Sequence, residues 1–156
     1  MKILYICTHN RCRSILSEAI TNQIAGDVIE AKSAGSQPAG VVHPLSLKYL
    51  AQTGYAIDGL QSHSWDDYED FKPDVVVTVC DSAAGEACPL YFGNSLKVHW
   101  GLSDPSKIDG DEVQTEQAFI ACIDKIVERV QKLKNIAAQH LDRDALKVAL
   151  AEIDAR

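Results

Sequence analysis

Short apolar runs alternate with stretches of helical periodicity along most of this chain. The apolar runs predict buried strands at 2–6, 28–32, 74–80 and 97–100. Helical patterns are predicted over 14–25, from His43-Pro44 to near Gly54, over 65–71, and from Val113 to about Gln139. The last of these is amphipathic, because one stripe carries Ala118, Cys122, Ile126, Val130 and Leu133.

Strands that alternate with helices predict a single α/β domain of three layers, in which a four-stranded parallel sheet carries helices on both faces. Ligands of such sheets bind beyond the carboxyl ends of the strands. Cys7 follows the first predicted strand, Cys80 ends the third and Asp104 lies just past the fourth, so we expect them to meet in space. The domain is predicted over 1–140, and 141–156 is predicted as a C-terminal helical extension that packs on it or contacts another subunit.

Composition and charge narrow the function classes. The 156 residues fit one domain with a full core, and 46% hydrophobic and 24% charged residues are ordinary for a soluble globular protein. A net charge of −7 argues against a nucleic-acid partner or a membrane surface, so any anion site must be locally positive. Five cysteines without a recognisable secretory leader predict reduced thiols and a cytoplasmic location. No apolar run approaches the about 18 residues that a membrane helix needs.

The segment Cys7-Thr8-His9-Asn10-Arg11-Cys12-Arg13-Ser14 carries the strongest chemical pattern, although a chance C-x5-R match is the plain alternative. It lies at a strand-to-helix turn, where consecutive N–H groups and a helix N-terminus can bind an oxyanion, so residues 8–14 are the candidate substrate-binding set. The same field favours a Cys7 thiolate, which makes Cys7 the candidate nucleophile. Arg13 can place two hydrogen bonds on a tetrahedral oxyanion, and Ser14 can cap the helix and donate to the leaving sulfur. We expect Asn10 in the left-handed backbone region and Arg11 at the exposed rim.

Asp104-Pro105 follows the last predicted strand. Alone, an Asp-Pro pair is usually a turn. Beside a thiolate and an arginine, an aspartate in a loop suits a general acid that protonates a departing oxygen. Asp104 is therefore the candidate acid, with Asp81 as a weaker competitor.

Cys80 and Cys88 enclose a small, polar segment. Zinc-binding cysteines usually lie two to four residues apart, so a metal pair is not expected here. A cysteine at each end of a flexible segment suits a thiol relay, in which one thiol attacks a sulfur adduct and the other takes over the disulfide. Two buried structural thiols are the alternative. Cys122 is expected in the core, and Cys12 either pairs reversibly with Cys7 or packs under the loop.

Four segments, in order, resemble the arsenate reductases built on the low-molecular-weight protein tyrosine phosphatase fold. They are residues 7–14, Ser33-Ala34-Gly35, the run ending Val-Val-Thr-Val-Cys80, and residues 99–105, and the resemblance covers residues 1 to about 135. It implies that Cys7 attacks arsenate held by the loop and Arg13, while Asp104 protonates the departing oxygen. It also implies a Cys7–Cys80 disulfide, its transfer to Cys80–Cys88, and reduction by thioredoxin, or by glutaredoxin with glutathione.

The sequence departs from that family at the loop, where His9 and Arg11 are bulkier and more basic than its usual residues. No cofactor is expected, apart from the potassium ion that some family members hold near the loop. Asn10, Glu18 and Ser33 match the ligands of that ion, whereas its aspartate has no clear match and His63 stands near that place.

The resemblance leaves a second function open, a low-molecular-weight tyrosine or small-molecule phosphatase that acts through a Cys7 phosphocysteine. Ser106-Lys107-Ile108, after the Asp-Pro pair, lacks the aromatic residues that grip a phenol ring, and Cys80 and Cys88 would have no role. A non-catalytic oxyanion or redox sensor is a third hypothesis, against which the intact set of nucleophile, arginine and acid argues.

Overall fold

The computed structural model describes residues 1–79, 95–102, 104–107 and 110–154. Its strands are β1 (Lys2–Ile6), β2 (Glu30–Ala34), β3 (Val75–Thr78) and β4 (Leu96–His99). Its helices are α1 (Arg13–Ala25), α2 (Pro44–Gln52), α4 (Glu112–Ala138) and α5 (Arg143–Asp154), with 3₁₀ turns η1 (Trp65–Tyr68) and η3 (Pro105–Lys107).

The four strands pair in parallel in the order β2-β1-β3-β4, which confirms the predicted four-stranded parallel sheet. The chain leaves β1 towards β2 on one side and later returns to β3 on the other. The carboxyl end of β1 therefore lies at the point where the strand order reverses, which is where open α/β sheets bind their ligands. Residues 7–12 begin at this point and lead into α1.

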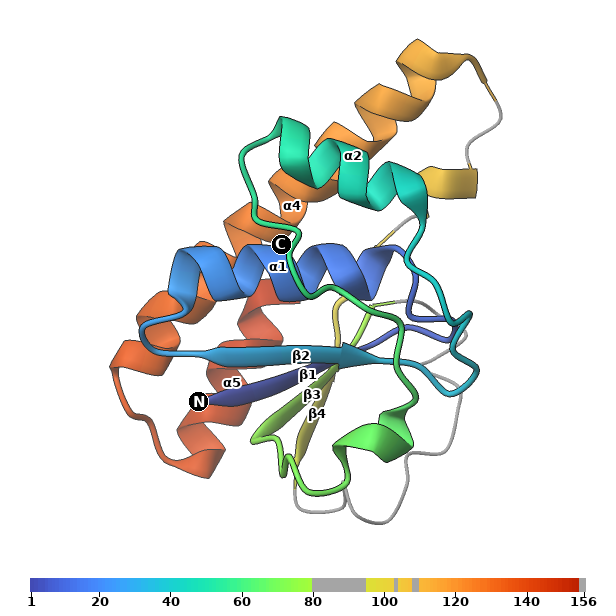
Figure 1. Cartoon of the computed structure of the whole chain (residues 1–156). Coiled ribbons are helices and arrows are strands. Elements are labelled where there is room, and N and C mark those ends of the chain that lie inside the picture. Colours follow the sequence, from blue (N-terminus) through green and yellow to red (C-terminus); the bar gives the residue numbers. More distant parts are fainter. Residues whose placement is uncertain (80–94, 103, 108–109, 155–156) are drawn as a thin grey trace.

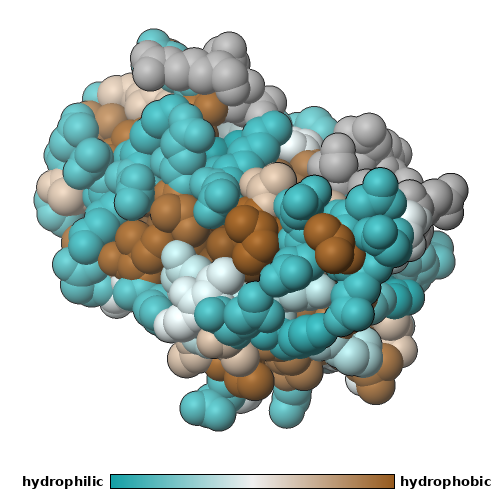
Figure 2. All heavy atoms as spheres, turned by 90° about the horizontal axis from the view of Figure 1, so that it is seen from above, coloured by the Kyte–Doolittle hydropathy of each residue, from teal (hydrophilic) through white to brown (hydrophobic). Residues whose placement is uncertain are grey.

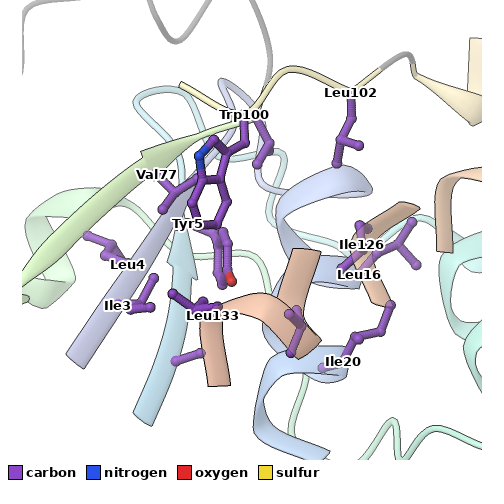
Figure 3. Packing of buried hydrophobic residues seen from close by; sticks show 14 of the residues in the cluster. Ile3, Leu4, Tyr5, Leu16, Ile20, Val77, Trp100, Leu102, Ile126 and Leu133 are labelled. Atoms are coloured by element: carbon purple, nitrogen blue, oxygen red, sulfur yellow. The ribbon is translucent and has the colours of Figure 1, made fainter. Parts of the chain in front are cut away.

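Helices α1, α2 and α4 lie together on one side of the sheet (Figure 1). The side chain of Tyr5 extends from β1 towards α1, where its hydroxyl shares a 2.8 Å hydrogen bond with Thr21. Helix α5 packs against α4 and β4, and the indole N–H of Trp100 donates to the Leu150 carbonyl over 3.3 Å. Tyr5, Trp100 and Leu133 belong to one buried hydrophobic cluster (Figure 3). Leu150 of α5 belongs to the same cluster, so α5 shares the core of the sheet.

The second strand begins two residues later than the sequence predicts, at Glu30 instead of Val28. The N–H groups of Val28 and Ile29 both donate to the carbonyl of Ala25 and close the turn after α1. Hydrophobic residues in this segment therefore bury themselves in a turn, which an alternation pattern does not distinguish from a strand.

The face shown in Figure 2 is mainly hydrophilic, as expected for a chain with 24% charged residues. Figure 2 shows the molecule from above Figure 1, where hydrophilic side chains dominate and a band of hydrophobic residues interrupts them. In the parts of the chain that the structure describes, we find no helix with the length and apolar character needed to span a membrane.

Candidate active site

Residues 7–12 form a loop whose carbonyl groups face outwards. The N–H groups of Gln37, Ala39 and His43 donate to the carbonyls of residues 8, 9 and 11, each over 2.9 Å. The segment 37–43 therefore wraps the outside of the loop. The backbone N–H groups of residues 9–12 have no protein acceptor within the described part of the chain. Consecutive N–H groups that are left without a protein acceptor beside a helix N-terminus can form a binding site for an anion.

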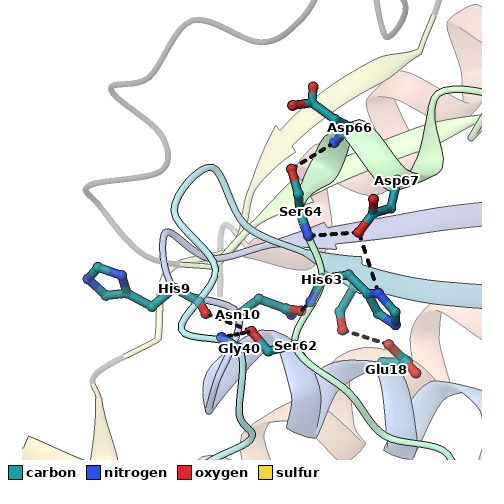
Figure 4. Close-up of polar contacts among 10 residues, drawn as sticks. His9, Asn10, Glu18, Gly40, Ser62, His63, Ser64, Asp66 and Asp67 are labelled. Carbon is teal, nitrogen blue, oxygen red and sulfur yellow. Dashed lines mark hydrogen bonds and ion pairs between the residues drawn. The ribbon is translucent and has the colours of Figure 1, made fainter.

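Asn10 fixes the shape of this loop. Its φ is +46°, as predicted for a left-handed residue, and its side chain is fully buried. Its amide Nδ2 donates to the hydroxyl of Ser14 over 2.8 Å, and its Oδ1 accepts the backbone N–H of His63 over 2.7 Å (Figure 4). The side chain thus ties the loop to α1 on one side and to the segment before η1 on the other.

Gly35 allows the loop to lie against the end of β2. A Cβ atom at this position would be 2.4 Å from the carbonyl oxygen of Thr8 and 2.5 Å from that of Cys7. Both contacts are to backbone, so no side chain can move to relieve them. The close approach requires glycine here.

Helix α1 begins directly at the loop without a side-chain cap. Its N-cap residue is Cys12, which makes no capping hydrogen bond. The expectation that Ser14 caps this helix is therefore wrong, because Ser14 lies inside the first turn and accepts its hydrogen bond from Asn10. The uncapped N–H groups leave the positive end of α1 available to an anion.

Arg13 has an unsatisfied donor beside this loop. One of its terminal nitrogens, Nη1, donates to the Leu102 carbonyl over 2.9 Å, and Nη2 lies 3.6 Å from Oδ2 of Asp104. Its Nε is buried and has no hydrogen-bond partner within the described residues. A buried N–H of a charged group without an acceptor is unfavourable, and a bound oxyanion would supply that acceptor.

Asp104 is far from Arg13 in the sequence but lies close to it in the structure. Its Oδ1 accepts the backbone N–H of Ser106 over 2.9 Å and the Ser106 hydroxyl over 2.6 Å. These two bonds leave Oδ2 directed towards Arg13. Both side chains are mostly buried, with exposed fractions of 15% and 16%, so the structure brings two of the predicted catalytic residues together.

The three cysteines described by the structure differ in their chemistry. Cys7, at the carboxyl end of β1, and Cys12 are both buried, as is Cys122 on the apolar face of α4. Burial raises the pKa of Cys12 to about 11 and that of Cys122 to about 12. Both therefore remain neutral thiols near pH 7, which fits the predicted core position of Cys122 and the packing alternative for Cys12.

Two basic residues stand at the rim of the loop. His9 and Arg11 are exposed, as expected for Arg11, and His9 Nδ1 lies 3.0 Å from the Gln37 carbonyl. His43 caps α2, because its Nδ1 accepts the N–H of Leu45 over 3.1 Å. Burial lowers the pKa of His43, and Arg11 lowers it further while Asp104 opposes this. His43 is therefore a neutral imidazole, and the positive charge at the loop comes from the arginines.

A nucleophile position, an arginine and an acid around an uncapped helix end suggest one protein family. A family model described as low molecular weight phosphotyrosine protein phosphatase matches residues 2–147. The chain belongs to this family. Its curated relatives include arsenate reductases. The chain is 34% identical to the enzyme of Halalkalibacterium halodurans over 129 residues, which are 83% of this chain and 91% of that protein. It is 33% identical to the enzyme of Bacillus subtilis over 132 residues, which are 84% and 94% of the two chains.

Solved structures of the family agree with this assignment. A thioredoxin-dependent arsenate reductase of Corynebacterium glutamicum superimposes with a TM-score of 0.68 and 27% identity, over 90% of this chain and 63% of that one. An arsenate reductase from Archaeoglobus fulgidus gives a TM-score of 0.70 and 26% identity, over 85% and 98% of the two chains. The predicted resemblance to phosphatase-fold arsenate reductases is confirmed.

The potassium ion of some family members does not fit the residues found in this low-molecular-weight phosphatase fold. Ser33 donates its hydroxyl proton to Glu18 over 2.6 Å, and Asn10 already accepts from His63. The imidazole of His63 lies between the carboxylates of Glu18 and Asp67 in Figure 4, so this place offers a ring nitrogen and not the oxygen ligand that a hard cation prefers. Burial raises the pKa of Glu18, although the hydrogen bond from Ser33 and the nearby Lys32 and His63 oppose this. Among the described residues, no group of three or more acidic, cysteine or histidine side chains could hold a metal ion.

Three predicted residues cannot be placed. Cys80, Cys88 and Asp81 lie outside the described residues, so the thiol relay and the alternative acid stay predictions.

Arg129 of α4 lies near the site, and the sequence pattern did not predict it. It lies on the buried face of that helix and binds the chain just before Asp104. A charged residue among apolar ones carries no mark that it is buried, and only its position in the helical stripe with Ile126 and Val130 could have indicated it.

Proposed function

We propose that this protein reduces arsenate to arsenite, with Cys7 as the nucleophile. The observation that carries this proposal is the anion cradle at the end of β1, formed by residues 7–12 and Arg13, where the N–H groups of residues 9–12 and the buried Nε of Arg13 have no acceptor among the described residues. Cys7 is the first residue of the cradle. The chain belongs to a family whose curated members include arsenate reductases, at about one third identity.

The first step uses the described residues. Arsenate binds with its oxygens on the loop N–H groups and on Arg13, which offsets its charge. The Cys7 thiolate attacks arsenic and forms an As–S bond. One As–O bond breaks, and Asp104 gives its proton to the departing oxygen, which leaves as water. Oδ2 of Asp104 lies 3.6 Å from Nη2 of Arg13, which supports Asp104 as the acid of this step.

The second step transfers two electrons to arsenic. The Cys80 thiolate attacks the sulfur of Cys7, so an S–S bond forms while the As–S bond breaks and its electron pair goes to arsenic as arsenite leaves. Cys88 then attacks Cys80, which releases the Cys7 thiolate and leaves a Cys80–Cys88 disulfide. Thioredoxin is the proposed reductant of that disulfide, since a structural relative of 27% identity is described as thioredoxin-dependent. Glutaredoxin with glutathione is the alternative donor. A chemistry that uses free thiols fits the reducing cytoplasm, which we propose as the location.

Phosphate-ester hydrolysis is the second candidate function. The family model is that of a phosphatase, and Cys7, Arg13 and Asp104 would serve phosphoryl transfer in the same positions. Pro105, Ser106 and Lys107 follow Asp104, so this turn offers no aromatic side chain to a phenol ring. Weak hydrolysis of aryl phosphates is therefore the expected side reaction.

The deciding experiment is arsenate-dependent NADPH oxidation, run with thioredoxin and its reductase in one assay and with glutathione, glutaredoxin and glutathione reductase in another. Wild type and Cys88→Ser are compared, and arsenite is quantified in the product. Turnover with thioredoxin that disappears in Cys88→Ser supports the full relay. Turnover only with glutathione and glutaredoxin, unchanged in Cys88→Ser, retains the reductase and removes Cys88 from it. Absence of arsenite in both assays, together with rapid aryl phosphate hydrolysis, would establish the phosphatase instead.

A further inference from the structure

Arg129 is a buried charged residue in the middle of α4. Its exposed fraction is 8%, and it lies among the core residues of that helix. Its two terminal nitrogens donate to neighbouring carbonyls of the chain after β4, Nη1 to Trp100 over 2.9 Å and Nη2 to Gly101 over 3.3 Å. The planar guanidinium is suited to bind two adjacent acceptors at once.

These carbonyls open the segment that carries Asp104. The next carbonyl, that of Leu102, is bound by Nη1 of Arg13. Three consecutive carbonyls are therefore bound by two arginines, one in α4 and one in the first turn of α1. On the other side, the N–H groups of Trp100 and Leu102 donate to the carbonyls of Thr78 and Val79, over 2.8 Å and 3.0 Å. The segment is held from both sides up to two residues before Asp104.

The surroundings of Arg129 hold it in place. It lines a small pocket with Tyr5, Trp100, Leu102 and Ile126, all residues of the core. Taking a guanidinium out of water is unfavourable unless its N–H groups are bound, and a well-packed apolar side chain at such a position is often as stable or more so. A buried arginine that binds the chain leading to the candidate acid is therefore better explained by orientation of that chain than by stability alone.

We propose that Arg129 is a positioning residue for the arsenate site, which acts by fixing the segment from Trp100 to Leu102, from which the chain leads to Asp104, so that the Asp104 carboxyl stays beside the bound anion. This rests on the proposed role of Asp104 in arsenate reduction. The hydrogen bonds that the structure describes for Arg129 go to the carbonyls of Trp100 and Gly101. Its effect on turnover passes through Asp104.

A double-mutant cycle with a stability control tests this. The proteins are wild type, Arg129→Met, Asp104→Asn and the double variant, with Leu133→Ala as the control. Leu133 is a fully buried residue of the same helix, and its apolar side chain cannot hydrogen-bond the carbonyls of the segment. For each protein, kcat and KM for arsenate are measured in the coupled assay well below the thermal midpoint. Hydrogen exchange of the amides of Trp100, Leu102 and Ser106 is followed by mass spectrometry.

Arg129→Met is expected to lower kcat about tenfold with little change in KM, since Arg13 and the loop remain. In the Asp104→Asn background the same substitution should change kcat less than twofold. Exchange of the three amides should become faster in Arg129→Met and not in Leu133→Ala, which loses thermal stability only. Equal loss of kcat in both backgrounds, or unchanged exchange of the segment, overturns the inference. If wild type produces no arsenite, the proposed function fails, and the exchange result alone decides whether Arg129 holds the segment.

Discussion

Substituting Gly35 by alanine tests whether the anion loop depends on backbone contact with β2. The added Cβ would be 2.4 Å from the Thr8 carbonyl oxygen and 2.5 Å from that of Cys7. Real Cβ contacts essentially never fall below 3.0 Å, so the nearer contact would have to open by about 0.6 Å. The strand cannot give way easily, because Gly35 donates to the His63 carbonyl and accepts from the N–H of Trp65. The loop must therefore move away from its place at the carboxyl end of β1.

The expected loss follows from that displacement. Inserting a methyl group into a packed site destabilises a protein by about 1–3 kcal/mol, which corresponds to a fall of about 2–12 °C in the thermal midpoint of a chain of this size. A shift approaching 1 Å in a catalytic group can reduce the rate by up to about 100-fold, and we expect Gly35→Ala to lower kcat/KM for arsenate by about 10- to 100-fold. The assay is coupled turnover, with phosphate affinity measured by calorimetry as a readout that needs no chemistry.

A second glycine separates this effect from general destabilisation. Gly54 follows α2, has a φ of +92°, and a Cβ there would contact nothing within 4 Å. Gly54→Ala should lose about 1 kcal/mol through backbone strain while its arsenate kinetics stay as in wild type. If Gly35→Ala retains wild-type phosphate affinity and turnover, or if Gly54→Ala loses both to the same degree, the reasoning about the close contact is wrong.

Three further changes have defined outcomes. Arg13→Lys keeps the charge but loses the fork, so kcat/KM for arsenate should fall at least about 100-fold, measured in the coupled assay against an unchanged thermal midpoint. Burial raises the pKa of Glu18 in the folded protein above its unfolded value of 4.5. The contribution of Glu18 to the free energy of unfolding is therefore most favourable below pH 4.5 and falls as the pH rises through the folded pKa. Glu18→Gln should therefore gain in unfolding free energy relative to wild type between pH 4 and pH 7 in urea titrations, and a constant difference across that range would contradict this. Cys12 and Cys122, with pKa values of about 11 and about 12, should resist iodoacetamide at pH 7 in the folded protein, as read by peptide mass spectrometry, and rapid labelling of either would refute their assignment as neutral buried thiols.

Much of the fold could be predicted because local pattern and long-range packing agree in this chain. The apolar run before Cys7 and the β-branched run before Val79 form the two central strands, and both are buried on two faces as their sequences require. The left-handed Asn10 was also predictable, since asparagine tolerates that conformation and a sharp turn had to lie there.

The parts that sequence could not provide depend on partners far along the chain. The carbonyls of the anion loop are fixed by residues 37–43, and nothing local to the loop indicates this. Serine is a residue type that often caps helices, but Ser14 lies inside the first turn of α1, and its hydroxyl accepts a hydrogen bond from Asn10. Arg129 is charged and yet buried, since its acceptors are the carbonyls of Trp100 and Gly101, which follow β4 and lie 29 and 28 residues away in the sequence. The contacts of Cys80 and Cys88 remain predictions.

The wrapping of the anion loop by residues 37–43 has a consequence for how the protein acquires its site. The carbonyls of the loop at 7–12 find their partners only once β2 has paired with β1 and the chain has turned back towards α2. Oxyanion binding is therefore a property of the assembled domain and not of the strand–loop–helix unit alone. In refolding, competence to bind phosphate should appear with the slow, long-range phase and after helix formation. For the same reason phosphate and arsenate favour the assembled state by mass action, so the substrate acts as a stabiliser of the whole fold.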